Sequence, residues 1–248
     1  MTVALIMAGG RGERMRVDGT TVPKPLVPIW GVPLLERNIL SLLYSGFHEI
    51  VVAVPSHTPQ IAGFVRSRGK SLADAVGGQL RLFQETQPLG NIGAAAKVDT
   101  GGRALLVIYA DNLTSLDLKA LVGHHSETGA GLTSAVHFEP FRIPYGEVEV
   151  HDGMVVAYRE KPEHRVLVSS GVFVLGSSAV RHLPPDQRKD VAWLVNRLLA
   201  EQVKVTAFLH DAPWIDVNDA HAISRAEQLL ASNPGAFENP AALPDHPA

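Results

Sequence analysis

Lysines, aspartates and an arginine-rich glycine segment are the residues of this chain whose types and spacing suit chemistry on anions. Gly9–Met15 reads GGRGERM and follows the apolar run Val3–Met7 after one alanine. A glycine-rich backbone presents N–H groups to an anion, and the arginines of the segment add fixed positive charge. Lys24 lies between Pro23 and Pro25, which we expect to hold it extended and pointing in one direction. The sequence therefore predicts an anion cradle with a lysine beside it.

Two familiar nucleotide motifs do not fit the glycine segment. A dinucleotide fingerprint, G-x-G-x-x-G, needs a third glycine where Met15 stands, and the second strand ends in AVPSH without an acid for a ribose. A P-loop needs Gly-Lys-Ser/Thr at its end, which is absent from the segment. A tight turn after a core strand stays open as the plain alternative for Gly9 and Gly10.

Two aspartates follow short apolar runs that we expect to be strands. Asp111 comes directly after Ala104–Ala110, and Asp216 ends the segment PWID. The carboxyl ends of parallel strands meet at one edge of a sheet, where the glycine segment also lies. Two carboxylates suit Mg²⁺, which takes its other ligands from water and phosphate oxygens. Each aspartate alone also fits a turn or helix cap, so the metal prediction rests on their occurring together with the glycine segment.

Composition narrows the function classes. The chain has 248 residues, a formal net charge of -3 and no cysteine. Bulk charge therefore gives no reason to expect nucleic-acid or membrane-surface binding, and thiolate metal sites, disulfides and cysteine nucleophiles are excluded. No apolar run approaches the ~18 residues of a membrane span, and the N-terminus has no basic region before its apolar stretch. We expect a cytoplasmic protein with no nucleic-acid and no membrane partner.

The first half of the chain alternates strands with helices. Pro33 opens a helix that Gly46 stops, a second helix runs to about Arg68, and Ser115 is a candidate cap for a third. This alternation is typical of a mostly parallel sheet with helices on both faces. The expected strands are Val3–Met7, Glu49–Val54, Leu80–Glu85 and Ala104–Ala110.

The second half has short strands with short connections. Asp152-Gly153 marks a hairpin turn, Asp190 caps a helix, and a final helix covers about 219–230. We expect one domain over 1–231, with a small antiparallel insertion that carries part of the site, and a loose Pro- and Ala-rich tail over 232–248. The expected strands are Leu132–His137, Gly146–Val150, Val155–Arg159, Val172–Leu175 and Lys204–Leu209.

An ordered set of motifs resembles the sugar-1-phosphate nucleotidyltransferases, from Met1 to about Leu230. The motifs are GGRGERM (Gly9–Met15), PKPLVPI (Pro23–Ile29), PLG (Pro88–Gly90), ADN (Ala110–Asn112), YG (Tyr145–Gly146), REKP (Arg159–Pro162), SSGVFV (Ser169–Val174) and WIDV (Trp214–Val217). The resemblance implies an α/β, Rossmann-like fold with a mixed, mostly parallel sheet. It also implies joining of a nucleoside triphosphate to a sugar 1-phosphate with release of pyrophosphate, and Mg²⁺ as cofactor.

The resemblance also implies roles for individual residues. Arg14 and Lys24 match the family's catalytic cations, and Asp111 and Asp216 match its magnesium ligands. The matching nucleotide-binding positions are Ala8, Gly9, Gly10, Gly12, Glu13, Arg14, Glu85, Pro88 and Gly90. The matching sugar-phosphate positions are Asn112, Tyr145, Gly146, Glu160, Lys161, Ser170, Gly171 and Trp214. We expect no catalytic histidine; His137, His164 and His210 are expected in loops or at strand ends.

The substrate pair is a narrower expectation. The chain ends soon after the WIDV helix, and this length favours the short members of the family. The length and the segment ETQPLG together favour GTP as the nucleotide, with a mannose- or heptose-type 1-phosphate, or a sugar-like cyclitol, as the second substrate. Uridylyl or thymidylyl transfer to a hexose 1-phosphate is the alternative, and a homodimer is a candidate assembly. A non-catalytic sensor of nucleotide sugars is the rival of another class, and it would be expected to lose the phosphate and metal residues. A glycosyltransferase would be expected to carry an Asp-x-Asp motif, which YADNL does not supply.

Overall fold

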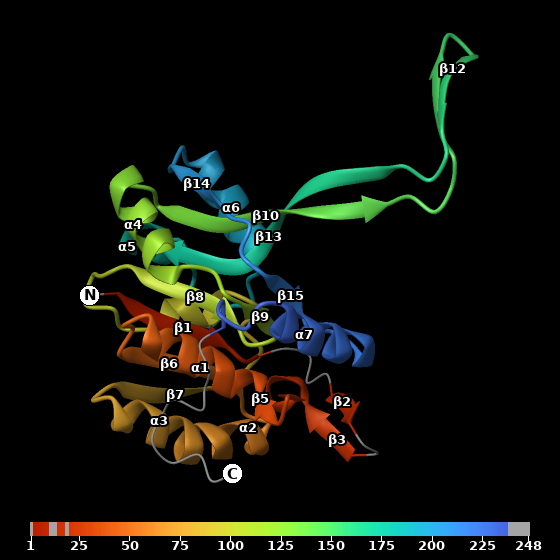
Figure 1. Ribbon diagram of the computed structural model, residues 1–248. Coiled ribbons are helices and arrows are strands. Elements are labelled where there is room, and N and C mark those ends of the chain that lie inside the picture. The colour runs from red at the N-terminus through yellow and green to blue at the C-terminus, as the bar shows by residue number, and fades with distance from the viewer. Residues whose placement is uncertain (1, 10–13, 18–19, 238–248) are drawn as a thin grey trace.

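A seven-stranded mixed sheet forms the centre of the computed structural model, which describes residues 2–9, 14–17 and 20–237 (Figure 1). In order across the sheet the strands are β14 (Val205–Leu209), β10 (Leu132–Arg142), β13 (Glu163–Leu175), β8 (Leu105–Tyr109), β1 (Val3–Met7), β6 (Glu49–Pro55) and β7 (Gln79–Glu85). Every pairing is parallel except those that β13 makes with β10 and β8. The predicted α/β class with a mixed, mostly parallel sheet is confirmed.

Helices cover both faces of the sheet, as predicted. Along β1, Ala4 and Ile6 face one apolar cluster and Val3, Leu5 and Met7 face the other, because successive side chains of a strand alternate between faces. The first cluster takes side chains from α1 (Leu34–Tyr44), α2 (Pro59–Phe64), α3 (Lys70–Ala75) and α4 (Leu118–Thr128). The second takes them from the 3₁₀ turn Gly93–Lys97, α5 (Ser177–Val180) and α6 (Val191–Ala200).

Most predicted helix boundaries hold, and three local expectations are wrong. Asp190 caps α6 as predicted. α4 begins later than expected: Asp117, not Ser115, accepts the N–H of Ala120. The second helix does not end near Arg68 but continues to Ala75 through a π-helical turn over Val65–Gly69. Finally, His137 lies inside β10 rather than at a strand end.

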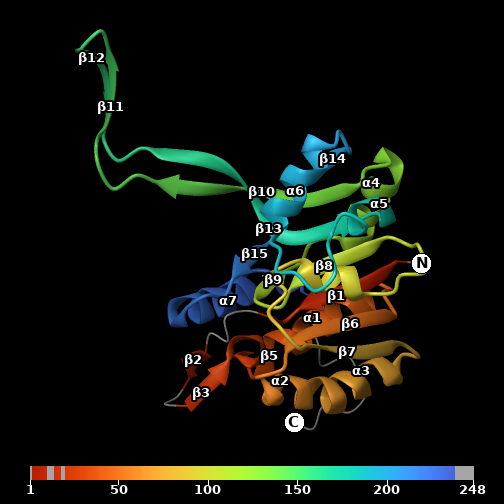
Figure 2. The same cartoon turned by 180° about the vertical axis from the view of Figure 1, so that it is seen from behind.

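The predicted antiparallel insertion projects from the body as a two-stranded ribbon. The outer parts of β10 and β13 pair out to Arg142 and Glu163, and β11 (Glu147–His151) pairs with β12 (Met154–Arg159) beyond them. The predicted turn is confirmed, since Asp152 and Gly153 both have left-handed φ values of 48° and 78°. Figures 1 and 2 agree that this ribbon extends away from the sheet and its helices. We call residues 138–167 the arm.

Small two-stranded ribbons gather at the edge of the sheet where β1 and β8 end. β2 (Arg14–Val17) pairs with β3 (Thr20–Pro23), β4 (Pro28–Ile29) pairs with β5 (Val32–Pro33), and β9 (Asn112–Thr114) pairs with β15 (Trp214–Asp216). α7 (Ala220–Ser232), which Asp219 caps, packs on them through a third apolar cluster that also includes Phe237. None of the helices in the described part of the chain is long and apolar enough to cross a membrane.

The buried His125 should make the stability of the fold depend on pH. His125 is buried in α4, its Nδ1 lies 2.8 Å from Thr133 Oγ1, and burial, followed by the charge of His124, lowers its pKa. The unfolded chain binds a proton near the usual pKa of about 6.5, which folded His125 resists. The free energy of unfolding therefore keeps its full value above pH 6.5 or so, and it decreases as the pH drops below about 6.5. Thermal unfolding between pH 7.5 and 5 measures this, and His125→Gln should flatten the dependence, whereas the exposed His151→Gln should leave it unchanged.

Candidate active site

A buried lysine sits between two carboxylates at the edge of the sheet. Lys24 is 8% exposed, and its Nζ lies 2.7 Å from Asp111 Oδ2 and 3.6 Å from Asp216 Oδ1. It also donates a hydrogen bond to the side chain of Asn218. Lys24 begins the 3₁₀ turn η1 (Lys24–Leu26), so the expectation of an extended backbone is wrong. Pro25 fits there because the first turn of a helix does not use its missing N–H.

Three segments far apart in the sequence bring these groups together. Asp111 follows β8 and its main-chain oxygen accepts the N–H of Val217 at 3.0 Å. Asp216 lies opposite Asn112 in the β9–β15 ribbon. The structure thus places the two predicted aspartates side by side where the strands end. Their predicted role as metal ligands stays a prediction.

The charge at this cluster is unbalanced in a way that suits a divalent cation. The pKa of Asp216 is raised mainly by burial and secondly by the neighbouring Asp111 carboxylate. Asp216 Oδ1 is buried and accepts no hydrogen bond from any described residue. No group of three or more acidic, histidine or cysteine side chains suited to a metal occurs within the described ranges. Two carboxylates with spare acceptor capacity fit Mg²⁺, which keeps water and phosphate oxygens as its remaining ligands.

A bulge in β13 connects this cluster to the base of the arm. Between the pairs Ser134–Phe173 and Val136–Ser169, the β13 strand carries extra residues. There the main-chain oxygen of Ser170 accepts hydrogen bonds from Asn112 Nδ2 at 2.7 Å and Trp214 Nε1 at 2.8 Å. The bulge therefore holds four predicted sugar-phosphate residues, Asn112, Ser170, Gly171 and Trp214, in one place.

A histidine network under the bulge was missed by sequence reasoning. The Ser170 hydroxyl lies 2.8 Å from both His137 Nδ1 and His210 Nε2, and the His137 ring lies 4.5 Å from that of Trp214. Burial, followed by His137, lowers the pKa of His210. His137, His210 and Trp214 line an open pocket of about 540 Å³ together with Arg165. The available signal was a histidine at the end of the expected strand Leu132–His137.

The predicted nucleotide residues fall partly within the described structure. Glu85, at the end of β7, is buried; one carboxylate oxygen accepts the N–H of Leu89 at 3.2 Å, and the other, Oε1, has no hydrogen-bond partner in the described structure. Burial raises the pKa of Glu85. A Cβ on Gly9 would lie 2.9 Å from Glu85 Oε1, so the two strand ends meet closely. Gly90 has a φ of 81° and packs on the backbone of Lys189.

Other predicted nucleotide residues are constrained mainly by backbone. The N–H of Ala8, which is buried, donates to the oxygen of Ala53 at 2.9 Å. Pro88 precedes the buried Leu89 in the same connection. The backbone of Arg14 lies opposite Pro23 in the β2–β3 ribbon, which puts it beside Lys24 in the fold. Gly10, Gly12 and Glu13 lie outside the described residues, as does the side chain of Arg14.

The remaining predicted sugar-phosphate residues are far from this cluster. Tyr145, Gly146, Glu160 and Lys161 all belong to the arm. Glu163 is six residue steps from Ser169 along β13, which is about 20 Å of extended chain, and Lys161 lies beyond Glu163. The structure therefore does not bring these four residues to the carboxylates of their own chain.

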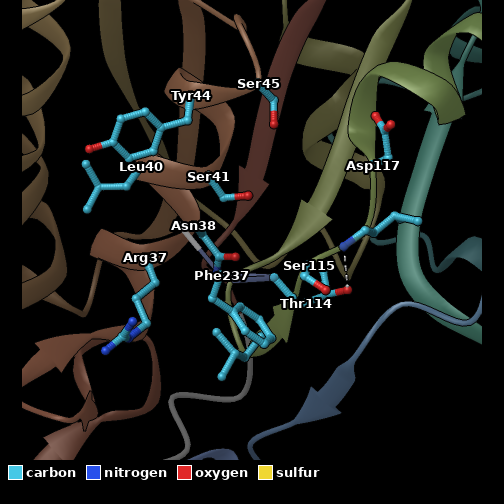
Figure 3. A pocket seen from close by; sticks show the side chains of 13 residues that line it. Arg37, Asn38, Leu40, Ser41, Tyr44, Ser45, Thr114, Ser115, Asp117 and Phe237 are labelled. Atoms are coloured by element: carbon cyan, nitrogen blue, oxygen red, sulfur yellow. Dashed lines mark hydrogen bonds between the residues drawn. The ribbon is translucent and has the colours of Figure 1, made fainter. Parts of the chain in front are cut away.

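A second hollow, of about 230 Å³, lies between α1 and the segment from β9 to α4 (Figure 3). Its wall includes Asn38, whose amide donates to the oxygen of Ala110 at 3.1 Å, and Thr114, whose hydroxyl accepts the N–H of Leu116. Phe237 from the C-terminal segment lines it as well. None of the predicted site residues lines this hollow.

Gly171 is the glycine on which this arrangement depends. It has a φ of 68°, and a Cβ there would collide with Asn112 Nδ2 and lie 2.9 Å from the Tyr109 ring. Gly171→Ala should therefore lower the free energy of unfolding by about 2–4 kcal/mol, combining backbone strain and overpacking. Gly129→Ala, at a φ of 61° with no atom within 4 Å, measures the backbone strain alone. Equal losses for both variants in denaturant titrations would contradict a packing role for Gly171.

Comparison with known proteins places this chain in a family. A model of the nucleotidyl transferase family matches residues 3–233. Mannose-1-phosphate guanylyltransferase catalytic subunit beta from Drosophila pseudoobscura pseudoobscura is 28% identical, covering 87% of this chain and 59% of that protein. Glucose-1-phosphate cytidylyltransferase from Salmonella typhimurium is 25% identical, covering 85% and 89%. UTP--glucose-1-phosphate uridylyltransferase from Synechocystis sp. is 27% identical, covering 86% and 59%.

The structural comparison agrees in fold. HddC from Yersinia pseudotuberculosis complexed with GMP-PN matches with a TM-score of 0.66 and 21% identity, over 92% of this chain and 99% of that one. The chain spans about three fifths of the length of the first curated relatives that it matches. The match over residues 3–233 and the relatives' names confirm the predicted resemblance. The chain belongs to the nucleotidyl transferase family, among the sugar-1-phosphate nucleotidyltransferases.

Proposed function

We propose that this chain transfers a nucleoside monophosphate from a nucleoside triphosphate to a sugar 1-phosphate and releases pyrophosphate. The observation that carries the proposal is the buried Lys24 held between Asp111 and Asp216, at the sheet edge where the predicted anion cradle begins. Relatives at 25–28% identity whose names state this type of reaction support it.

The reaction needs no nucleophile from the protein. A sugar 1-phosphate carries an anionic oxygen near neutral pH, since the second pKa of a phosphomonoester is about 6. That oxygen forms a bond to the α-phosphorus of the triphosphate, and the bond from this phosphorus to the pyrophosphate oxygen breaks. The protein's task is to align two polyanions and stabilise the charge on the phosphoryl oxygens. We assign this task to the ammonium of Lys24 and the guanidinium of Arg14.

We include Mg²⁺ as the cofactor of this site. Asp111 and Asp216 would hold it, and when bound it supplies charge neutralisation at the phosphate oxygens. In the described structure Lys24 donates to Asp111 and Asn218. If Asp111 and Asp216 held Mg²⁺, the Lys24 ammonium would be free to donate to phosphate oxygens. We therefore assign Lys24 a role in binding the reacting groups.

The sugar 1-phosphate is proposed to bind at the bulge of β13. Asn112 and Trp214 are fixed there by the Ser170 main-chain oxygen, and Gly171 leaves room for Asn112. Lys161 is proposed to hold the phosphate of this substrate. Its φ of 45° is in the left-handed region, which is uncommon for a residue other than glycine. Glu160, Tyr145 and Gly146 are proposed to contact the sugar hydroxyls.

GTP with a mannose- or heptose-type 1-phosphate is the substrate pair we favour. Glu85 Oε1 is buried without a partner within the described structure, and it faces Gly9. Guanine presents two neighbouring N–H donors, at N1 and N2, which one carboxylate accepts together. A guanylyltransferase is among the relatives, beside a uridylyltransferase and a cytidylyltransferase. Uridylyl or thymidylyl transfer to a hexose 1-phosphate is the alternative.

A matrix of nucleoside triphosphates against sugar 1-phosphates tests the proposed function. Pyrophosphate release is measured for five triphosphates, each paired with a panel of hexose and heptose 1-phosphates and with Mg²⁺ present. We expect release with GTP and a mannose- or heptose-type 1-phosphate. Release with another pair would retain the reaction and change the substrate, whereas no release from any pair would favour a non-catalytic sensor.

Glu85→Gln tests the assignment of the base. In this variant the glutamine amide has one hydrogen-bond acceptor and one donor in place of two acceptors. The donor opposes the N–H groups of guanine, whereas the amide as a whole complements the N3–H and carbonyl edge of uracil. kcat/KM for GTP should fall about 10- to 100-fold, the value of one hydrogen bond to a charged group, while that for UTP rises or stays level. The exposed neighbour Gln84→Ala should alter neither. Equal losses for GTP and UTP would contradict base reading by Glu85.

A further inference from the structure

The arm carries most of the large hydrophobic side chains that the described structure leaves exposed. Eleven of those fifteen side chains lie between residues 138 and 167. They are Phe138, Phe141, Tyr145, Val148, Val150, Met154, Val155, Val156, Tyr158, Val166 and Leu167. A concentration of this kind on one projecting segment marks an interaction surface.

The tip of the arm has one apolar and one charged face. Val148 pairs with Tyr158, and Val150 with Val155. The alternate pairs lie on the opposite face, which also carries Ala157 and Met154; there Arg159 reaches Glu147 at 3.5 Å and Glu149 at 3.3 Å. An isolated two-stranded ribbon is marginally stable in water, so the apolar face requires a surface to cover it. The body of the same chain does not provide that surface, because the arm extends away from it (Figure 2).

The arm also carries the groups that the candidate active site lacks. Asp111, Asp216 and the bulge at Ser170 lie in the body, whereas Lys161 lies more than 20 Å out along the ribbon. A lysine side chain spans only about 6 Å, so Lys161 cannot reach the bulge of its own chain in this conformation. The site is therefore incomplete within one extended chain.

The position of the site at the base of the arm points to a second copy of the chain. In a two-fold symmetric pair the same patches meet reciprocally. If the two arms lie antiparallel, the tip of each arm reaches the base of the other, which is where Ser170 and Trp214 lie. We propose that the arm is exchanged between two copies of this chain, so that the partner's Lys161 completes the sugar-phosphate site beside Asp111 and Asp216.

Mixed dimers test this inference, which rests on the proposed function. One chain carries Lys161→Ala and the other carries Asp111→Asn, each with its own affinity tag, and dimers that contain both tags are isolated after co-expression. Pyrophosphate release is assayed with GTP and mannose 1-phosphate, or the best pair from the matrix, below saturation of the sugar phosphate. Exchange of the arms leaves one intact site per mixed dimer, so about half of the wild-type activity should return. If both altered chains stay as inactive together as alone, the inference is overturned.

Sedimentation of the full chain tests the exchange independently of activity. We expect a dimer for the wild type and a monomer for the triple variant Val148→Thr, Val150→Thr and Val155→Thr. Glu149→Gln, on the charged face, is the matched control and should stay dimeric. A monomeric wild type, or a triple variant that remains dimeric, would overturn arm exchange. If the wild type dimerises through the arm but shows no activity with any substrate pair, the proposed function fails while the interface stands.

Discussion

Asp111→Asn and Asp216→Asn are each expected to lower kcat for pyrophosphate release by at least two orders of magnitude while the protein stays folded. Both carboxylates sit within ion-pair distance of the buried Lys24, and Asp216 Oδ1 has spare acceptor capacity within the described structure. Under the proposed function, removing one charge from this pair removes a proposed Mg²⁺ ligand and its field at the phosphate oxygens. Groups aimed at developing charge typically contribute a factor of ~10²–10³ each.

Two measurements separate this effect from simple damage. Circular dichroism and thermal unfolding should show both variants folded, and Asp74→Asn, which loses only an exposed ion pair to Lys70, should keep full activity. Burial raises the pKa of Asp216 most, and the Asp111 charge raises it further. Asp111→Asn should therefore lower that pKa, which carboxyl NMR can follow without any substrate. Full activity in both variants would remove the aspartate pair from the proposed mechanism.

The sequence predicted the parts of the fold that depend on local chemistry. Val3–Met7 and Ala104–Ala110 are apolar throughout, as buried parallel strands must be, and β1 and β8 lie there. Asp190 precedes an amphipathic run and caps α6. The convergence of Asp111 and Asp216 followed from one general rule, that ligands bind where parallel strands end. These features needed no knowledge of how distant segments pack.

Features that depend on distant packing could not be predicted in the same way. The Ser170 hydroxyl joins His137 and His210, which become neighbours only when β10, β13 and β14 assemble. The motifs placed Lys161 in a sugar-phosphate site, but no local pattern sets how far a ribbon projects before it bends. Lys24 shows the same limit. Its flanking prolines are compatible with both an extended backbone and a 3₁₀ turn. The structure has the 3₁₀ turn, in which Lys24 contacts Asp111 and Asn218.

Lys24→Met is expected to impair activity and stability together. Methionine keeps the length and apolar stem of the side chain but leaves two neighbouring carboxylates without their cation. Breaking a fully buried ion pair costs about 3–5 kcal/mol; since the aspartate side chains are about one third exposed, we expect a smaller loss, about 2–3 kcal/mol, in the free energy of unfolding. Pyrophosphate release should also fall by two orders of magnitude or more, because the ammonium no longer meets the phosphate oxygens.

The response to Mg²⁺ distinguishes the proposed role of Lys24 from a purely structural one. In the wild type a cation must displace the Lys24 ammonium from the carboxylates, whereas in Lys24→Met it binds them without competition. Millimolar Mg²⁺ should therefore raise the Tm of Lys24→Met more than that of the wild type, because a ligand that binds only the folded state stabilises it by mass action. Lys97→Met, which loses an ion pair with the exposed Asp186, is the matched control and should behave as the wild type. Equal increases in Tm on adding Mg²⁺ in all three proteins would mean that Lys24 does not compete with a cation for the carboxylates. Its contacts with Asp111 and Asp216 would then serve the fold alone.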